Sequence, residues 1–331
     1  MKTTTLGANG PEITQFGLGA MSFAGAYGGT TQEKSNEVLD ACFDAGVTHL
    51  DTANIYGEGR SEEICGAWLR DRPGMRDNWT IATKAGIVIG DPDRRFNNEG
   101  AYLEAELDGS LKRLGVDYVD LFYVHRREAA IPIEEVAGSL GRLVEKGKVK
   151  GIGFSEIAPN SLREAHAEFP VTAVQSEYSL STRACEMGLV QACGELGVTL
   201  VAFSPLGRSF LTDAPFTREA LEDIPFLNGN PRFMEPNYSK NLEAVKPFLA
   251  LAREMGEPAA ALAVAWCRAK GDHVVPIPGT KSVAHLGELI RGAELELSEA
   301  QVEAIEAALP LGWAHGDRYN VTQWVGPEKY G

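Results

Sequence analysis

The sequence predicts an α/β protein in which eight parallel strands and their helices close into a (β/α)8 TIM barrel, as one domain over residues 1–331. Two observations support this fold. Strand-like apolar runs alternate with helical patterns along the chain, and eight such runs can be counted. Most of them are also too continuous for a sheet with one face in water, so we expect them to be buried under helices on both faces.

The expected strands are short runs that end in a polar residue or a glycine. They are placed at 13–19, 47–51, 79–84, 118–125, 149–155, 171–177, 198–204 and 273–280. Pro276 and Pro278 lack the amide hydrogen that a central strand donates, so we expect them where the last strand ends. Asn9-Gly10 lies between two strand-like runs and predicts an N-terminal hairpin over residues 1–15 that closes the bottom of the barrel.

Helices are expected between these strands. Thr30 and Glu33 form a capping-box pattern before a helix that ends at Gly46, and Ser61 is the expected cap of the next helix, 61–71. Further helices are placed at 98–114, 133–147, 160–168, 185–197, 241–255 and 258–270.

Two long segments, 205–240 and 309–331, are rich in Phe, Trp, Tyr, Asn and Gly. Loops of this length in a compact protein are usually lids or binding loops, so we expect both over the barrel's C-terminal face; a loosely ordered tail is the alternative for the second. A two-domain dinucleotide-binding fold is the rival architecture. Its glycine fingerprint fails here, because in GLGAMS at 17–22 Ser22 stands where the third glycine belongs.

Composition narrows the possible partners. The chain has 31 basic and 46 acidic residues, a formal charge of −15, which disfavours nucleic acid and anionic membranes. Its five cysteines form no C-x-x-C pair, so neither a disulfide framework nor a thiolate zinc site is indicated, and no metal is expected. The start lacks an apolar signal region and no apolar run approaches a membrane span. We expect a cytoplasmic protein; self-association cannot be predicted.

Four residues with reactive side chains stand at or near expected strand ends: Asp51, Lys84 and His125 close three successive strands, and Tyr56 follows Asp51 in a loop. Strand ends converge on one face of a barrel, so these side chains are expected to meet. Each residue alone has a simpler interpretation. Asp51 could cap a helix or loop, Lys84 could be a solvated charge, His125 a structural histidine, and Tyr56 part of the core. Together they form a candidate catalytic group.

The chemistry of this group suits protonation of an oxygen. A buried lysine needs an anion, which Asp51 supplies, and an adjacent ammonium is expected to lower the pKa of Tyr56 so that it serves as a general acid. His125 then donates to and orients the substrate oxygen. Such a set favours carbonyl reduction, with a nicotinamide as the hydride source.

Seven stretches resemble, in their order, the aldo-keto reductases. They read LDTANIYG, ATK, LFYVH, GIGFSE, VQSEYS, VAFSPLGRSFL and IPGTKSVAHL and extend over essentially the whole chain. The likeness is nearest to the long-chain bacterial, plant and fungal branch. It implies reversible NADP(H)-dependent reduction of an aldehyde or ketone. In that mechanism Tyr56 is the general acid, Lys84 tunes its acidity with Asp51 as the partner of the lysine, and His125 orients the carbonyl.

The resemblance also implies a set of cofactor contacts. Ser155, Glu156 and Gln175 would lie at the nicotinamide carboxamide, with Glu156 where many relatives have asparagine. Phe203 would stack on the nicotinamide ring in place of a common tyrosine. The other expected cofactor residues are Gly19, Ala20, Met21, Ser204, Pro205, Leu206, Gly207, Arg208, Gly279 and Thr280.

The adenosine end departs from the family pattern. Lys281 and Ser282 fit the basic pattern of relatives that bind a 2′-phosphate, and Glu288 is kept, but His285 replaces an arginine and Leu289 an asparagine. A lysine binds phosphate without the bidentate contacts of arginine. NADPH is therefore the expected cofactor, and NADH the alternative.

The expected substrate is a small-molecule carbonyl or alcohol. Phe23, Tyr27, Arg126 and Trp313 are its candidate contacts; packing onto the barrel is the alternative for Trp313, and pairing with acidic loops the alternative for Arg126. Two other functions remain open. One is a lyase with Lys84 as a Schiff base; the other is a non-catalytic nicotinamide-binding sensor on the same barrel.

Overall fold

The centre of the molecule is a barrel of eight parallel strands, in a computed structural model that describes residues 1–91 and 94–329. The strands are β3 (Leu18–Gly19), β4 (His49–Asp51), β5 (Thr80–Ala85), β6 (Val119–Val124), β7 (Val149–Ser155), β8 (Val171–Glu177), β9 (Thr199–Phe203) and β10 (Val274–Pro276). They pair in chain order from β3 to β10. Two further hydrogen bonds, from Gly17 N to Pro276 O and from Gly19 N to Pro278 O, both 3.0 Å, join the last strand to the first. The predicted (β/α)8 barrel is confirmed.

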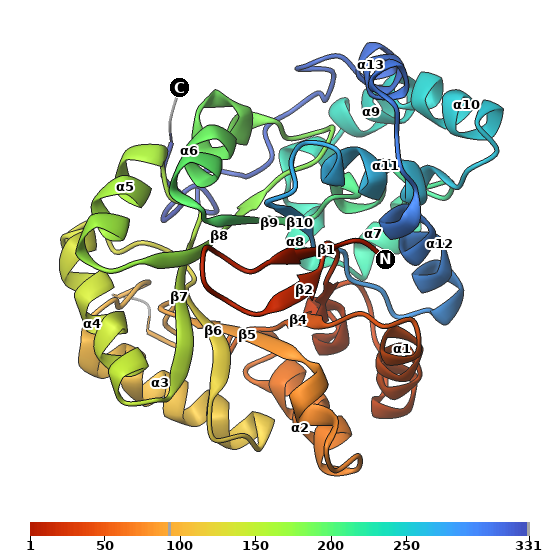
Figure 1. The fold of residues 1–331 in the computed structure, drawn as a ribbon. Helices are drawn as coiled ribbons and strands as arrows, with labels where there is room; N and C mark the ends of the chain where they lie inside the picture. Colours follow the sequence, from red (N-terminus) through yellow and green to blue (C-terminus); the bar gives the residue numbers. More distant parts are fainter. Residues whose placement is uncertain (92–93, 330–331) are drawn as a thin grey trace.

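Helices surround this barrel (Figure 1). They are α1 (Gln32–Asp44), α2 (Arg60–Arg70), α3 (Gly100–Leu114), α4 (Ile133–Glu145), α5 (Pro159–Glu168), α6 (Leu189–Leu196), α7 (Arg218–Glu222), α8 (Pro225–Asn228), α9 (Asn237–Ala244), α10 (Lys246–Glu254), α11 (Ala259–Arg268), α12 (Val283–Glu294) and α13 (Glu299–Ala308). Short 3-10 helices are η1 (Ala20–Ala24), η2 (Met75–Asn78), η3 (Ala184–Met187), η4 (Gly207–Ser209) and η5 (Pro231–Phe233). The larger core lies between helices and sheet, and both faces of the strands are buried, as their apolar runs require.

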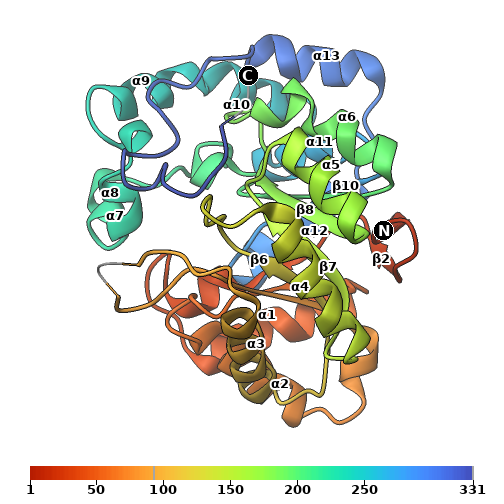
Figure 2. The same ribbon diagram turned by 90° about the vertical axis from the view of Figure 1, so that its left-hand side faces the viewer.

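The two ends of the barrel differ. The hairpin of β1 (Thr3–Thr5) and β2 (Glu12–Thr14) lies at one end, and its Leu6 and Ile13 side chains pack inside the barrel with Ala82 and Val201. This confirms the predicted closure of the bottom. Helices α7 and α8 lie at the opposite end, as does the C-terminal segment, residues 309–329 (Figure 2).

Local predictions at helix starts were partly wrong. The cap of α1 is Thr31, whose side chain accepts from Lys34 N, and not Thr30. Helix α2 begins one residue earlier than predicted, after Gly59 in the left-handed region, and the Ser61 hydroxyl donates to Ala20 O instead of capping. A sequence pattern identifies a polar residue near a helix start but does not decide between neighbouring candidates.

The C-terminal half contains more helix than predicted. The expected helix 241–255 is two helices that meet at Val245. The segment 205–240 contains four short helices, η4, α7, α8 and η5, and the start of α9, and α12 and α13 were not predicted. The missed start of α13 carries a capping box of Ser298 and Gln301. Pro276 ends β10, as expected. Residues 330–331 of the predicted tail lie outside the described residues. In the described part of the chain, no helix is both long and apolar enough to cross a membrane.

The seam between β3 and β10 requires glycine. A Cβ on Gly279 would lie 2.6 Å from Gly19 O, so Gly279→Ala is expected to destabilise the protein by about 1–3 kcal/mol through overpacking. Gly287→Ala is the matched control: this helical position in α12 is open, and alanine there is expected to stabilise by up to about 1 kcal/mol. Urea unfolding of both variants measures these effects. Equal free energies of unfolding for Gly279→Ala and Gly287→Ala would contradict close packing between β3 and β10.

Candidate active site

Asp51, Tyr56, Lys84 and His125 meet at the C-terminal end of the barrel. Asp51 ends β4, Lys84 lies in β5 beside it, and His125 follows β6. The loop that carries Tyr56 is held to β5 by backbone hydrogen bonds, including Asn54 N to Lys84 O at 3.1 Å, and His125 N donates to Ala85 O at 2.8 Å. The parallel register therefore brings together residues that are far apart in the sequence, as predicted.

Lys84 forms a buried ion pair with Asp51. Its Nζ donates to Asp51 Oδ1 and, at 2.8 Å, to Thr52 O, and neither side chain is more than 2% exposed. Burial is the largest single effect and opposes the charged amine, but the charges and hydrogen bonds of Asp51 and Tyr56 together outweigh it and raise the pKa of Lys84. Lys84 is thus a charged ammonium that cannot leave its partner without a large desolvation cost.

Tyr56 lies against this ammonium. Lys84 Nζ is 5.1 Å from the centroid of the Tyr56 ring, and the His125 ring stands nearly perpendicular to that ring at 5.7 Å between centroids. The pKa of Tyr56 is nevertheless raised, because burial outweighs the lowering effect of Lys84. The expected net decrease in the pKa of Tyr56 is therefore wrong, although Lys84 acts in the expected direction.

His125 is neutral. Burial, with Arg126 and Lys84 nearby, holds its pKa well below the ordinary value. Its side chain is 6% exposed, and Nδ1 has no hydrogen-bond partner among the described residues. A neutral imidazole can donate from one ring nitrogen, which is what orienting a carbonyl oxygen requires.

The three residues expected at the nicotinamide carboxamide adjoin this group. Gln175 Nε2 donates to Asp51 Oδ2 at 2.8 Å, so Gln175 is linked to the ion pair itself. Ser155 Oγ accepts from Arg126 Nη1 at 3.1 Å. Glu156, in left-handed backbone with φ of 59°, has its carboxylate bound to Arg318 and to the amide of Glu177.

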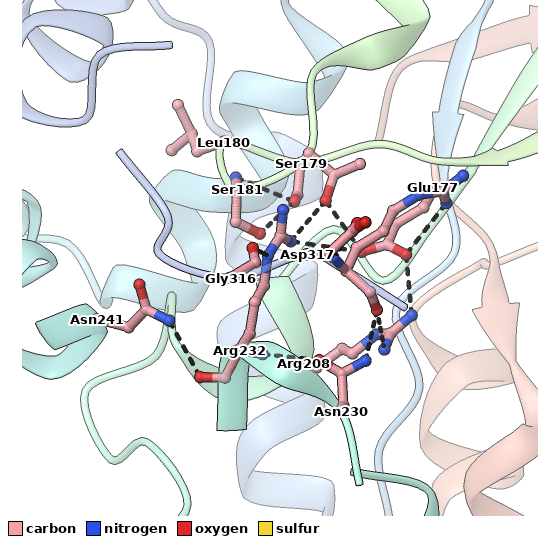
Figure 3. A network of polar contacts seen from close by, with 12 residues as sticks. Glu177, Ser179, Leu180, Ser181, Arg208, Asn230, Arg232, Asn241, Gly316 and Asp317 are labelled. Carbon is pink, nitrogen blue, oxygen red and sulfur yellow. Dashed lines mark hydrogen bonds and ion pairs between the residues drawn. The ribbon is translucent and has the colours of Figure 1, made fainter. Parts of the chain in front are cut away.

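Arg318 and Glu177 belong to a buried polar network that sequence reasoning missed. Arg208 donates to Glu177 at 2.9 Å, and Arg318 contacts both Glu177 and Glu156. Figure 3 shows Arg208, Arg232 and Asp317 gathered around Glu177. The network fastens the loop after β9 and the C-terminal segment to the ends of β7 and β8. Its only sequence signal is a set of charges in segments rich in aromatic residues.

The C-terminal segment continues across the end of the barrel. Glu328 accepts from Ala158 N at 2.6 Å and from Arg127 Nε at 3.0 Å, and its own amide donates to Glu156 O. The segment therefore packs onto the active-site end instead of forming a loose tail.

The candidate substrate contacts lie in different environments. Phe23 is fully buried, and Trp313 is 9% exposed with its Nε1 bonded to Leu180 O, so both pack in the core. The Tyr27 ring lies against Phe216 and Phe226, at 6.1 and 5.1 Å between centroids. Arg126 borders the catalytic group, within 2.7 Å of His125 O.

Several features fit a dinucleotide beside this group. Ser204, Gly207, Arg208 and Ser209 have left-handed backbone, a geometry that often forms anion-binding concavities. The residues Gly279–Ser282 join β10 to α12, and Ser22 Oγ donates to Thr280 O at 3.0 Å, so the Gly19–Met21 turn adjoins them. Ser282 caps α12, accepting from His285 N. Phe203, which ends β9, is only partly buried.

Lys281 is the cation expected at the adenosine end. Its Nζ donates to Tyr27 O at 2.6 Å and Gly28 O at 3.0 Å, and no ion pair to it occurs among residues 1–91 and 94–329. This lysine is therefore held by neutral carbonyls. Burial and the nearby Lys34 lower its pKa, and an anion bound beside it would oppose that shift. Within the described parts of the chain, no group of His, Cys, Asp and Glu could hold a metal.

Comparison with known proteins shows the family of this chain. The aldo/keto reductase family model matches residues 15–310. The chain is 40% identical over 316 residues to "Probable aldo-keto reductase 1" of Glycine max, covering 95% of this chain and 90% of that protein. It is 38% identical over 312 residues to "Aldo-keto reductase yakc [NADP(+)]" of Schizosaccharomyces pombe, covering 93% and 92%.

A solved structure, the glycerol dehydrogenase AKR11B4 from Gluconobacter oxydans, matches with a TM-score of 0.80 at 25% identity, covering 93% of this chain and 94% of that one. The chain belongs to the aldo/keto reductase family, and is an oxidoreductase that acts on carbonyl groups.

Proposed function

We propose that this protein reduces an aldehyde or ketone to the alcohol, reversibly, with NADPH as the reductant and Tyr56 as the proton donor. The observation that carries the proposal is the position of the Lys84 ammonium, paired with Asp51 and 5.1 Å from the Tyr56 ring centroid. A phenol beside a fixed positive charge can release a proton to a developing alkoxide, because the charge stabilises the phenolate left behind.

Each residue has a separate part in this mechanism. When bound, the nicotinamide supplies or accepts the hydride. Neutral His125 donates a hydrogen bond that orients the carbonyl oxygen, and the Tyr56 hydroxyl gives that oxygen its proton. Asp51 keeps Lys84 charged and in place, and Gln175 holds Asp51 from its other oxygen. In the direction of alcohol oxidation, the same phenol oxygen takes the proton back.

The Schiff-base alternative has less support. A lysine that attacks a carbonyl must be a neutral amine, usually obtained by burial or by another nearby cation. Here burial is outweighed by Asp51 and Tyr56 together, so the pKa of Lys84 is raised. Borohydride trapping with benzaldehyde tests this: covalent labelling of Lys84 would favour the lyase.

The five cysteines support a reducing, cytoplasmic setting. All five are buried and none forms a disulfide among the described residues, and burial raises the pKa of four of them: Cys42, Cys65, Cys193 and Cys267. Thiols of this kind are poor nucleophiles and serve as core packing.

Cofactor preference depends on Lys281. We expect Lys281→Ala to raise the Michaelis constant for NADPH by roughly 10- to 100-fold, since it removes a charged contact to the 2′-phosphate, and to leave the value for NADH within about threefold. Lys112→Ala, an exposed lysine on α3, is the matched control. Steady-state kinetics with both cofactors measure the effect. An unchanged NADPH constant would reject the phosphate contact.

A panel screen tests the substrate range. Following nicotinamide absorbance with sugars, aromatic aldehydes, quinones and cyclic ketones identifies the carbonyl that the enzyme reduces best. No turnover of any carbonyl with either cofactor would favour the non-catalytic, nicotinamide-binding alternative.

A further inference from the structure

The arginines at the active-site end are mostly paired with carboxylates. Arg127 pairs with Glu328, Arg208 with Glu177, and Arg318 with Glu156 and Glu177. Arg232 approaches Glu177 at 3.9 Å and donates to Thr182 Oγ1 at 2.8 Å. These charges therefore hold the loops and the C-terminal segment in place (Figure 3).

Arg126 differs from all of these. Among residues 1–91 and 94–329 it has no carboxylate within ion-pair distance; its Nη1 donates to two neutral acceptors, His125 O at 2.7 Å and Ser155 Oγ at 3.1 Å. The side chain is partly buried, and the segment around Gly326 packs near its Cβ. A half-buried guanidinium with no counter-ion has lost hydration without gaining an ion pair, so an anion that reaches it gains a charge-assisted contact.

The position of this guanidinium defines which anion it meets. It adjoins the catalytic histidine and the serine that ends β7, and its charge acts on Tyr56, His125 and Tyr319. The other residues expected to contact the dinucleotide, Ser204–Arg208 and Gly279–Ser282, lie instead after β9 and β10. Arg126 therefore faces the reacting end of the site, where the carbonyl compound binds.

We infer that Arg126 is a specificity-determining residue that selects carbonyl substrates carrying an anionic group, a carboxylate or a phosphate, close to the reacting carbon. This rests on the proposed carbonyl reduction and names its substrate class. The neutral hydrogen bonds to His125 O and Ser155 Oγ use one nitrogen of the guanidinium, and the others remain to bind two oxygens of the anion side by side.

Isosteric pairs of substrates test the inference. Each carboxybenzaldehyde isomer (2-, 3- and 4-) is compared with the matching nitrobenzaldehyde, which has the same shape but no charge. The quantity measured is the ratio of kcat/KM for the carboxylate to kcat/KM for the nitro compound. We expect Arg126→Gln to lower this ratio roughly tenfold or more for at least one isomer, and Arg126→Lys to restore part of it.

The ratio separates charge recognition from folding, because a general loss of activity lowers both rates together. Arg127→Gln is the matched control, since this neighbouring arginine is already bound to Glu328 and Ile131 O and is expected to leave the ratio unchanged. A ratio that is the same in wild type and Arg126→Gln for all three isomers would overturn the inference, while turnover of nitrobenzaldehyde would leave the proposed function intact.

A binding measurement does not depend on turnover. Calorimetry with the hydroxymethylbenzoate isomers, against the neutral nitrobenzyl alcohols, is expected to show at least a roughly tenfold loss of carboxylate affinity in Arg126→Gln. Charge-selective binding without turnover of any aldehyde would reject the proposed function and keep the anion site. Equal affinities in both proteins would reject the anion site.

Discussion

Tyr56→Phe is expected to lower kcat for carbonyl reduction by about two to four orders of magnitude, the usual contribution of a positioned general acid. Phenylalanine keeps the ring that lies against Lys84 and His125 but removes the oxygen that carries the proton. The Michaelis constant for NADPH should change little, because no contact to the cofactor depends on that hydroxyl in the proposed mechanism. Single-turnover kinetics separate the chemical step from cofactor release.

A second tyrosine of the chain provides the control for this variant. Tyr118→Phe removes a hydroxyl from a tyrosine at the opposite end of β6 and should leave kcat within about twofold. If Tyr56→Phe reduced a good aldehyde at the wild-type rate, another group would be the general acid and the proposed mechanism would be wrong.

The pH dependence of the wild-type enzyme follows from the same residue. Reduction needs the protonated phenol, and burial raises the pKa of Tyr56 above its ordinary value near 10. The rate of the reductive chemical step is therefore expected to stay level towards pH 9 and to fall only above pH 10, while oxidation of the alcohol rises with pH. A reductive rate that halves between pH 6 and 8 would contradict this assignment.

Asp51→Asn is expected to destabilise the protein by about 3–5 kcal/mol, the effect of leaving one charge of a buried pair without its partner. Lys84 is fully buried and Asp51 is 2% exposed, so water cannot replace the lost carboxylate. The uncharged amide also disturbs the bond from Gln175. Urea unfolding measures the change in free energy, and activity should fall as well because the position and charge of Lys84 both depend on Asp51.

A double variant separates the charge from the packing. Asp51→Asn with Lys84→Met removes both charges and should recover at least about half of the lost stability without recovering activity. Glu243→Gln, which breaks the exposed pair with Lys246, is the surface control and should cost less than about 1 kcal/mol. If Asp51→Asn were as stable as Glu243→Gln, the Lys84–Asp51 ion pair would not be desolvated and the account would be wrong.

The sequence predicted the barrel because its strands are buried on both faces, so apolar runs such as 118–125 are recognisable without any other information. Predicting the meeting of Asp51, Lys84 and His125 needed one further rule, that parallel strands end at the same face. Both conclusions depend on local patterns repeated along the chain, which is the kind of information a single sequence carries well.

The polar network was not predictable in the same way. Arg318 lies 141 residues from Glu177 and 162 from Glu156, and no periodicity connects them. The net direction of the pKa of Tyr56 was also missed, because it depends on how deeply the phenol is enclosed as well as on which charge is beside it. Burial of that kind is a property of the folded loops.

One measurement tests the central claim most directly: the transfer of deuterium from NADPH, labelled at nicotinamide C4, to nitrobenzaldehyde, followed by mass spectrometry of the alcohol. Each C4 epimer of the label is used in turn. The mechanism predicts one deuterium at the former carbonyl carbon with one epimer, and almost no product with Tyr56→Phe. Alcohol without deuterium from either epimer, or equal labelling rates in wild type and Tyr56→Phe, would contradict it.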